Sequence, residues 1–541
     1  RPPRSTLFPY TTLFRSFNPP GLLVREFFLF NQIREVYMIE NNKYIVDDVE
    51  LSNIYDRYLK AMEKRSLWEN HWNECYEYAL PQKSGLFSGR TEGAKKNIDI
   101  FDSTAESAVE QLAGSLLAQL TPPWSKWFGL GFGVDVDDGD DDRQQKYAEL
   151  DNIQKVLQSH FDRSNFYVEA HQCYLDLITV GTAVMLMEEN NVGEISAFNF
   201  TAVPMNEVAL EENVNGKLDT VFRCSRLTLL NLKLRFGEFN FDSKQLDVIY
   251  KNPDAKVSVI EAVFPRITPS GQQGYNYVAF VDDSDGTLLS GEKFVLKTGV
   301  FAHSPFICFR WLKVPSEVYG RSPVMKALPD IKTANKVVEL ILKNASIAVS
   351  GVWQADDDGV LNISNITLAP GVIIPKAVGS SGLTPLQTGA DFDVSQLVLS
   401  DLRTKINHSL LVDQLSAFTT SKMTATEVIE RTNQMSRILG ATYGRLQSEF
   451  LTPVILRAIS ILKRRGEISD IFVNGHEVDL KYQSPLAKNQ AVRDAENILG
   501  WIKSVSELGE EALSVIDKRA VALWLAKTFS IPERLIVEKN G

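Results

Sequence analysis

The first part of the chain carries helical patterns of apolar residues. From Val49 to Ala79 apolar side chains recur near helical spacing, which predicts one amphipathic helix that ends before Pro81. These side chains are Ile54, Tyr58, Met62, Trp68, Trp72 and Tyr76. The segment DIFDSTAESAVEQLAGSLLAQL predicts a second amphipathic helix, which two prolines end. Further helices are predicted over residues 147–160 and 166–180.

Residues 197–309 show mainly the pattern of β-strands. Segments such as VSVIEAVF and YVAFVDDSDGTLLSG predict hairpins, and the second contains an Asp-Gly turn. The segment TAVMLM predicts a strand just before this region, and residues 228–236 predict one helix within it.

Two helices around a short β segment are predicted next. Ser322 is an N-cap followed by Pro323 at the first helical position, and the helix restarts at Pro329 and runs to Gly351. Residues 352–390 hold five glycines and three prolines among β-branched residues, which indicates short strands and turns. Apolar residues at strict four-residue spacing then predict a second helix; they are Val394, Val398, Leu402, Ile406 and Leu410.

A long helix is predicted over residues 424–465. Thr424 and Glu427 form a T-x-x-E capping box at its start, and a basic last turn with Gly466 marks its end. At 1.5 Å per residue this is roughly 60 Å of helix. Pro453 removes one hydrogen bond and clashes with the preceding turn, so we expect a kink.

The composition is that of a protein that folds and does not bind DNA tightly. Hydrophobic residues at 44% and charged residues at 23% are near the averages for globular proteins, and 541 residues predict several packed units. The net charge of -11 counts against many contacts with phosphates. It is compatible with a conduit past which DNA slides, and it is also ordinary for soluble proteins. No run of apolar residues is long enough for a membrane span, so no membrane partner is expected.

No pattern for catalysis, a cofactor or a metal site is found. The sequence lacks GxxxxGK[ST], HExxH and GxSxG, and its four cysteines are far apart without a CxxC. GLGFG lacks the glycine spacing of a dinucleotide loop, and the glycine and final Glu of a calcium loop are misplaced around the acidic residues 137–142. The KRRG sequence ending at Gly466 fits a helix end better than a DNA-binding patch. We therefore expect a non-enzymatic protein without cofactors.

The first 37 residues carry no periodic pattern. The run RSTLFPYTTLFRS resembles a translated sequencing adapter, and Met38 begins an acidic start. Arg25 and Glu26 split the apolar stretch that a signal peptide would need. We expect residues 1–37 to be a non-native extension that packs against nothing.

Five motifs in a fixed order carry a resemblance to a known family. They are TPPWSKWF, FRCSRLTLLNLKLRFG, YGRSP (residues 319–323), TATEV (residues 424–428) and LGATYGRLQSEFLTP (residues 439–453). Together they resemble the head-to-tail connector, or portal, proteins of podoviruses, over about residues 45–535. The sequence departs from that family in its first 37 residues and in ending at Gly541 without a long polar tail.

The resemblance implies an α+β, mainly helical portal fold and a ring of twelve copies at one capsid vertex of the virion, through which double-stranded DNA enters and leaves. It implies these regions: 38–321 wing, 322–351 first stem helix, 352–390 clip, 391–412 second stem helix, 413–423 tunnel loop, 424–465 long kinked wing helix and 466–541 helical crown. The implied partners are the terminase large subunit and the capsid, scaffolding and tail adaptor proteins, with assembly in the host cytoplasm.

Two sets of residues are the candidate sites. In the stem, Leu402 and Ile406 are expected on the faces that join neighbouring helices, and a charged replacement of either is expected to block ring formation while the monomer keeps its secondary structure. Three charged residues are then left to the channel or to intersubunit pairs: Asp401, Arg403 and Lys405. In the tunnel loop the expected channel-facing residues are Ser416, Thr419, Thr420, Ser421 and Lys422.

Lys422 is the one cation in the sequence of the tunnel loop. Repeated around a ring it would form a belt of positive charge facing the DNA backbone, screened by salt. The alternative is a solvent-exposed lysine on an ordinary connection.

Two other classes of protein compete with the portal hypothesis. A tail adaptor would not need a chain of this length with a helix hairpin around a β clip. A DNA-processing enzyme would need catalytic motifs that the sequence lacks.

Overall fold

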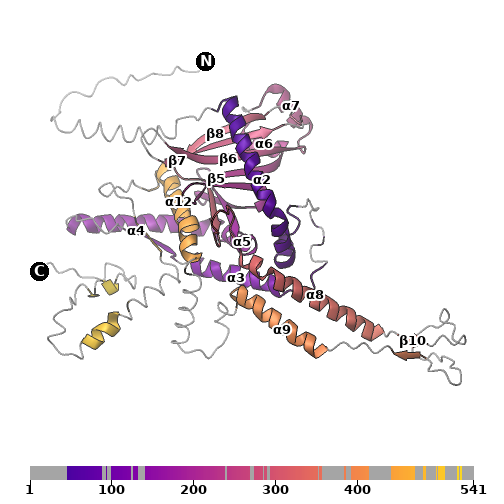
Figure 1. Cartoon of the computed structure of the whole chain (residues 1–541). Helices are drawn as coiled ribbons and strands as arrows, with labels where there is room; N and C mark the ends of the chain where they lie inside the picture. The colour runs from indigo at the N-terminus through magenta and orange to yellow at the C-terminus, as the bar shows by residue number, and fades with distance from the viewer. Residues whose placement is uncertain are drawn as a thin grey trace, which may run out of the picture. The chain divides into compact units, whose positions relative to one another are not determined.

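A computed structural model gives the fold (Figure 1). It describes residues 46–87, 93, 95, 99–123, 126–131, 140–237, 241–267, 273–283, 286–288, 293–350, 353–355, 383–385, 392–412, 440, 442–468, 479–482, 495, 498–505, 521–522 and 524–526. The predicted extension 1–37, the tunnel loop 413–423, Thr424 and Glu427 lie outside these residues. The described residues form an α+β fold in which helices predominate.

The chain divides into two compact units. The smaller unit is Arg1–Ser52 with Arg226–Ala302, and the larger is Asn53–Ser225 with His303–Gly541.

Four helices supply much of the larger unit. They are α2 (Asp48–Ala79), α3 (Thr104–Leu120), α4 (Asp140–Arg163) and α5 (Phe166–Val180). The pattern predicted α2 and α5 well, because each has a continuous apolar face. Helix α3 begins later than predicted, since the Asp102 carboxylate accepts a hydrogen bond from the Thr104 N–H at 2.9 Å. Helix α4 begins earlier than predicted, and acidic residues suit its first turn.

Helix α5 leads directly into an antiparallel three-stranded sheet of the order β3-β2-β9. The strands are β2 (Thr182–Glu189), β3 (Phe198–Val203) and β9 (Phe306–Arg310). The central strand β2, predicted from TAVMLM, is buried over its first six residues. Two further pairs are β4 (Val208–Glu212) with β5 (Leu218–Thr228), and β1 (Phe128–Gly131) with β12 (Asp479–Tyr482). Because β12 is a strand, the region expected as a helical crown is not helical throughout.

Aromatic rings fill the core between α4, α5 and the three-stranded sheet. Phe161 and Phe166 lie 5.1 Å apart between ring centroids, and Trp127 stacks on Phe166 at 5.7 Å. Phe200 of β3 contacts Phe166 at 5.0 Å. This cluster fixes the elements on which the candidate site is built.

The smaller unit contains a second antiparallel sheet and two helices. They are α6 (Leu229–Phe236), α7 (Ser243–Lys251), β6 (Lys256–Ile267), β7 (Gln273–Asp282) and β8 (Lys293–Phe301). The predicted helix 228–236 is confirmed, and the Thr228 side chain caps it by accepting from the Asn231 N–H. Helix α7 was not predicted, although Asp242 and Gln245 form a capping box at its start. The β7–β8 connection is longer than the expected Asp-Gly turn.

The predicted helix hairpin with a β pair at its end is present in the larger unit. Its elements are α8 (Pro323–Ser350), β10 (Trp353–Ala355), β11 (Leu383–Pro385) and α9 (Phe392–Ser409). Helices α8 and α9 lie side by side (Figure 1). The expected restart at Pro329 is wrong, because α8 is continuous through that proline. Buried residues on either side, such as Leu328 and Ile331, hold the helix despite the lost hydrogen bond. Among the described helices, none is both long and apolar enough to cross a membrane.

Candidate functional site

The apolar face of α9 packs within one chain. In α9, Leu402 and Ile406 are buried, and Ile406 is only 1% exposed. Val398, which shares their four-residue spacing, is 45% exposed, whereas Leu399 is buried. Four residues turn an α-helix by about 40° more than one full turn, so a strict four-residue stripe drifts off the contact face. Since Leu402 and Ile406 already face this subunit, a charge there would disturb the subunit itself.

The three charged residues predicted for the stem have partners in the same chain. Arg403 forms an ion pair with Asp102, ahead of α3, at 2.9 Å. Lys405 pairs with Asp401 one turn away at 2.7 Å, and both side chains are more than half exposed. Arg403 was predicted to face the channel or another subunit; instead it pairs with Asp102 and so ties α9 to the segment before α3.

Asn335 of α8 completes this junction, and sequence reasoning missed it. Its side-chain oxygen accepts hydrogen bonds from the N–H groups of Phe101 at 2.6 Å and Asp102 at 3.1 Å. Its amide donates to the Asp99 carbonyl at 2.9 Å. The signal available in the sequence was a polar residue within an apolar helix, because such a side chain needs hydrogen-bond partners if it is buried. Asn335 and Arg403 thus connect α8 and α9 to one short segment, residues 99–102.

Tyr319 and Arg321 of the YGRSP motif pack against α2. The Tyr319 ring meets Trp72 edge-on at 4.9 Å, and its hydroxyl oxygen accepts a hydrogen bond from the Leu210 N–H at 3.3 Å. The Arg321 guanidinium lies 4.4 Å from the Trp68 ring centroid. Burial raises the pKa of the Tyr319 hydroxyl well above its usual value, so this group stays neutral.

The next motif residues join the end of α5 to the start of α8. A Cβ on Gly320 would lie 2.2 Å from the Gly181 carbonyl oxygen, so only glycine allows the two backbones to approach this closely. Gly181 has φ +80, and its C-cap position ends α5. Ser322 donates to the Thr179 carbonyl at 2.9 Å and accepts from the Met325 N–H at 2.9 Å, which confirms the predicted N-cap.

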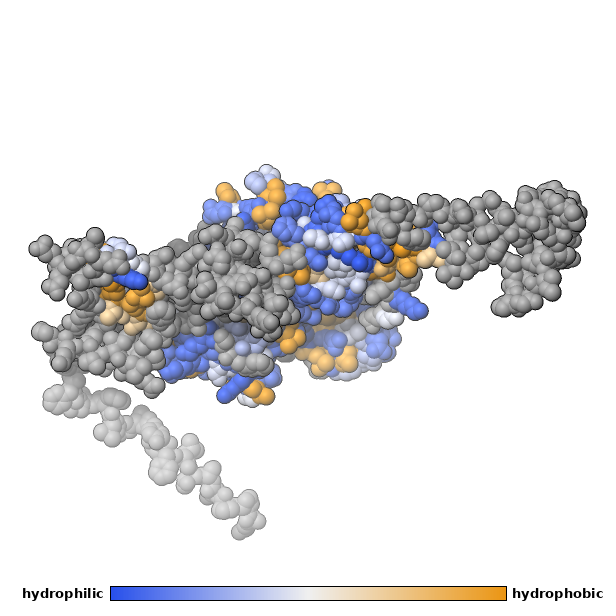
Figure 2. Space-filling view, turned by 90° about the horizontal axis from the view of Figure 1, so that it is seen from below, coloured by the Kyte–Doolittle hydropathy of each residue, from blue (hydrophilic) through white to orange (hydrophobic). Residues whose placement is uncertain are grey.

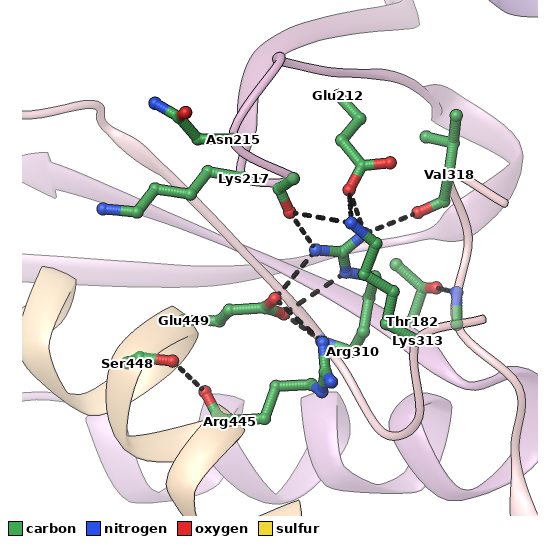
Figure 3. Close-up of polar contacts among 12 residues, drawn as sticks. Thr182, Glu212, Asn215, Lys217, Arg310, Lys313, Val318, Arg445, Ser448 and Glu449 are labelled. Carbon is green, nitrogen blue, oxygen red and sulfur yellow. Dashed lines mark hydrogen bonds and ion pairs between the residues drawn. The ribbon is translucent and has the colours of Figure 1, made fainter. Parts of the chain in front are cut away.

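Arg310, at the end of β9, is a fully buried cation whose contacts are drawn in Figure 3. Its guanidinium lies between two carboxylates, with Nη2 2.8 Å from Glu449 Oε1 and Nη1 3.3 Å from Glu212 Oε1. The same group donates to the carbonyls of Gly216 at 2.7 Å and Val318 at 3.1 Å. The Arg310 backbone N–H also donates to Glu449 at 3.0 Å. A buried charge is tolerated when it is paired and hydrogen-bonded in this way.

Glu212 receives a second cation. Lys313 pairs with the oxygen that Arg310 contacts. Burial by itself raises the pKa of Glu212, but the hydrogen bonds and positive charges of Lys313 and Arg310 outweigh it and lower the pKa overall. Glu212 is therefore a carboxylate at neutral pH.

Glu449 lies in an irregular turn of the predicted long helix. Residues Gln447–Leu451 form a π-helical turn, and α12 (Thr452–Arg464) follows with Pro453 near its start. Thr452 donates through both its backbone N–H and its hydroxyl to the Gln447 carbonyl. The irregularity predicted from Pro453 thus takes the form of a π turn in the residues before it. Phe450 of this turn lies 4.3 Å from the Phe309 ring centroid.

The basic end of α12 is neutralised by acids of the same chain. Arg464 pairs with Glu189, and Arg465 pairs with Glu467 at 2.6 Å. Glu467 also contacts His160 Nε2 at 2.7 Å. Because His160 Nδ1 accepts from the Ala197 N–H, Nε2 carries the proton that is donated to Glu467. These partners support the helix-end interpretation of KRRG over a DNA-binding patch.

The described side chains do not assemble a metal centre. Within the ranges that the structure describes, no group of three or more His, Cys, Asp or Glu residues could hold a metal ion. The described cysteines are free, and Cys75, Cys173 and Cys308 are buried. The predicted tunnel-loop residues Ser416, Thr419, Thr420, Ser421 and Lys422 and the cap residues Thr424 and Glu427 lie outside the described part of the chain.

The chain is similar along most of its length to one protein family. The profile of the family described as bacteriophage head to tail connecting protein matches residues 51–537. The probable portal protein of Bordetella phage BPP-1 is 25% identical over 523 residues, 92% of this chain and 90% of that protein. The portal protein of Salmonella phage epsilon15 is 24% identical over 492 residues, 87% of this chain and 86% of that protein. The portal protein of Escherichia phage T7 is 19% identical over 421 residues, 76% of this chain and 75% of that protein.

These matches confirm the resemblance found in the motifs. The chain belongs to the family of bacteriophage head-to-tail connecting proteins. Within that family its relatives are phage portal proteins, and the family is a structural one rather than a class of enzymes.

Proposed function

We propose that this chain is one subunit of a portal ring that stands at a single capsid vertex of a virion and conducts double-stranded DNA during packaging and ejection. The observation that carries the proposal is the paired helices α8 and α9 in a chain that matches the connector family over residues 51–537. In this ring α8 and α9 are the stem, residues 352–390 the clip, and residues 38–321 and 424–465 the wing, with 466–541 as the crown.

The outer surface of the stem helices supports assembly with further copies. Four apolar side chains toward the β10–β11 end are between 45% and 73% exposed: Leu340, Leu342, Leu397 and Val398. Figure 2 shows apolar side chains among polar ones on one face of the molecule. Apolar side chains this exposed are expected to be covered when neighbouring stems pack around a channel.

The further partners follow from the same role. We infer twelve copies, docking of the terminase large subunit and later of a tail adaptor at the clip, contacts with capsid and scaffolding proteins, and assembly in the host cytoplasm before incorporation into the virion. A ring that only conducts DNA needs no catalytic residues and no cofactor of its own.

Negative-stain electron microscopy of the purified chain tests the ring. Annular particles with a central hole are the expected result. Monodisperse monomers that turn over nucleotides would contradict the portal proposal.

The tunnel loop, residues 413–423, is proposed to face the channel with Ser416, Thr419, Thr420, Ser421 and Lys422. Lys422→Glu should allow rings to assemble but impair packaging or retention of DNA, because it replaces a ring of positive charge by a negative one. The defect should ease at high salt, where charges are screened. Lys422→Gln is the control that removes the charge alone. Normal packaging and retention by Lys422→Glu particles at low salt would contradict the charged belt while leaving the ring intact.

A further inference from the structure

The π turn places two successive residues of the long helix against the body of the larger unit. Glu449 contacts Arg310 through both the side chain and the backbone N–H of the arginine. Phe450 enters the aromatic core, with Tyr174 5.9 Å and Phe309 4.3 Å away between ring centroids. In a regular α-helix, successive side chains diverge by about 100°, so the wider π turn helps both to face the body.

A π turn holds one residue more than the α-helical turn it replaces. It is less stable in isolation than regular α-helix and persists where surrounding contacts favour it. If the turn became α-helical, the extra residue would pass into the preceding segment. That segment, which includes residues 442–446, would rotate by about 100° and move by about 1.5 Å relative to the body.

The charges around Arg310 show which contact is specific to the turn. Glu212 and the carbonyls of Gly216 and Val318 surround Arg310 on its other sides. They belong to the end of β4, the β4–β5 connection and the segment before α8. Glu449 is the contact of Arg310 that comes from the long helix. Arg445, one turn earlier, lies 3.6 Å from Glu449 and sits on the same side of the helix.

We propose that the Arg310–Glu449 pair is a positioning pair that holds the π turn and so sets the rotational register of the helix before α12. The register is a property of the chain itself. Only its consequence rests on the proposed function. Residues 442–446 belong to the helix predicted over 424–465, which begins directly after the tunnel loop, so the pair would set the direction from which that helix meets the channel.

Spin labels on the full-length chain test the register. One label is placed at Gly440, where an added Cβ meets nothing within 4 Å, and the other at Val168 of α5, which is 64% exposed. Cys224 is replaced by serine, since the other three cysteines are buried, and labelled chains are diluted with unlabelled ones so that distances within one subunit are measured.

Glu449→Gln keeps the size of the side chain and removes its charge. It should move the label distance, or split it into two populations, by on the order of 5 Å, the displacement expected of a label on a helix that rotates by one residue. The matched control is Glu212→Gln, which removes the other carboxylate of Arg310 without touching the helix and should leave the distance unchanged. Circular dichroism confirms that each variant is folded.

Deleting Ser448 removes the extra residue of the turn. In that background there is no extra residue that could pass into the preceding segment, so Glu449→Gln should no longer change the label distance. Three outcomes overturn the proposal: a wild-type distance in folded Glu449→Gln, an equal shift in Glu212→Gln, or a shift that persists after the deletion. If the label shifts as expected but Glu449→Gln particles retain DNA normally, the portal channel role of this helix is contradicted and the positioning pair is not.

Discussion

Arg310 and Glu449 are separated by 139 positions in the sequence, yet the guanidinium of one lies 2.8 Å from the carboxylate of the other inside the larger unit. The pair joins the last residue of β9 to the helix that runs into α12. The Arg310 side chain is fully buried, so its charge is balanced by carboxylates of the protein and not by solvent. The contact therefore links the packing of the sheet to the placement of the long helix.

Removing the buried cation should destabilise the chain strongly. Arg310→Met leaves Glu449 and Glu212 partly buried without their shared partner, and we expect a loss of about 3–5 kcal/mol in the free energy of unfolding. Lys405→Met is the control, since the side chains of Lys405 and Asp401 are 57% and 63% exposed and their ion pair should contribute little to stability. Urea unfolding followed by circular dichroism measures both. Equal losses would show that burial does not decide the strength of these pairs.

The close approach of two glycines should tolerate no side chain. Gly320→Ala places a Cβ 2.2 Å from the Gly181 carbonyl oxygen, where backbone must move, so the soluble yield and the melting temperature should fall sharply. In Gly440→Ala the added Cβ has no heavy atom within 4 Å. Because alanine favours a helix more than glycine does, this variant should be more stable by about 1 kcal/mol. A Gly320→Ala variant as stable as wild type in thermal unfolding would refute the tight contact.

The two faces of α9 should respond differently to charge. Leu397 is 73% exposed, so Leu397→Glu should leave the subunit folded and prevent ring assembly. Ile406 is buried within the chain, so Ile406→Glu should cost on the order of 4 kcal/mol and unfold α9 before assembly is reached. Circular dichroism reports folding, and sedimentation velocity reports the ring. Normal rings from Leu397→Glu would show that this face is not an interface.

Acid should weaken the Arg310 cluster. The folded-state pKa of Glu212 lies below its usual value of 4.5, so the folded chain binds this proton less readily than the unfolded chain. The stabilisation is complete above the unfolded-state pKa and is lost as the pH falls through the lowered folded-state pKa. The free energy of unfolding should thus be steady from neutral pH to about pH 5 and decline below about pH 4.5. Glu212→Gln should make this decline shallower, whereas an unchanged slope would exclude Glu212 as a contributor.

Local chemistry in the sequence was enough to predict several elements. Helix α2 and helix α5 follow from apolar periodicity, and the start of α8 follows from Ser322 and Pro323, because these signals act over three or four residues. The family also followed from short motifs in order. Where the local signal was ambiguous, as at Pro329, packing of the flanking apolar residues decided the outcome.

Only the tertiary structure decided which distant side chains meet. The sequence shows Arg310 as the charged end of an apolar strand and Asn335 as a polar residue in an apolar helix, but it does not indicate that their partners are Glu449 and residues 99–102. It predicted an irregularity near Pro453 and not a π turn, since that turn depends on contacts of Glu449 and Phe450 with elements more than 100 positions away. Periodicity and capping are set within one or two helical turns, whereas ion pairs and buried amides depend on the path of the whole chain.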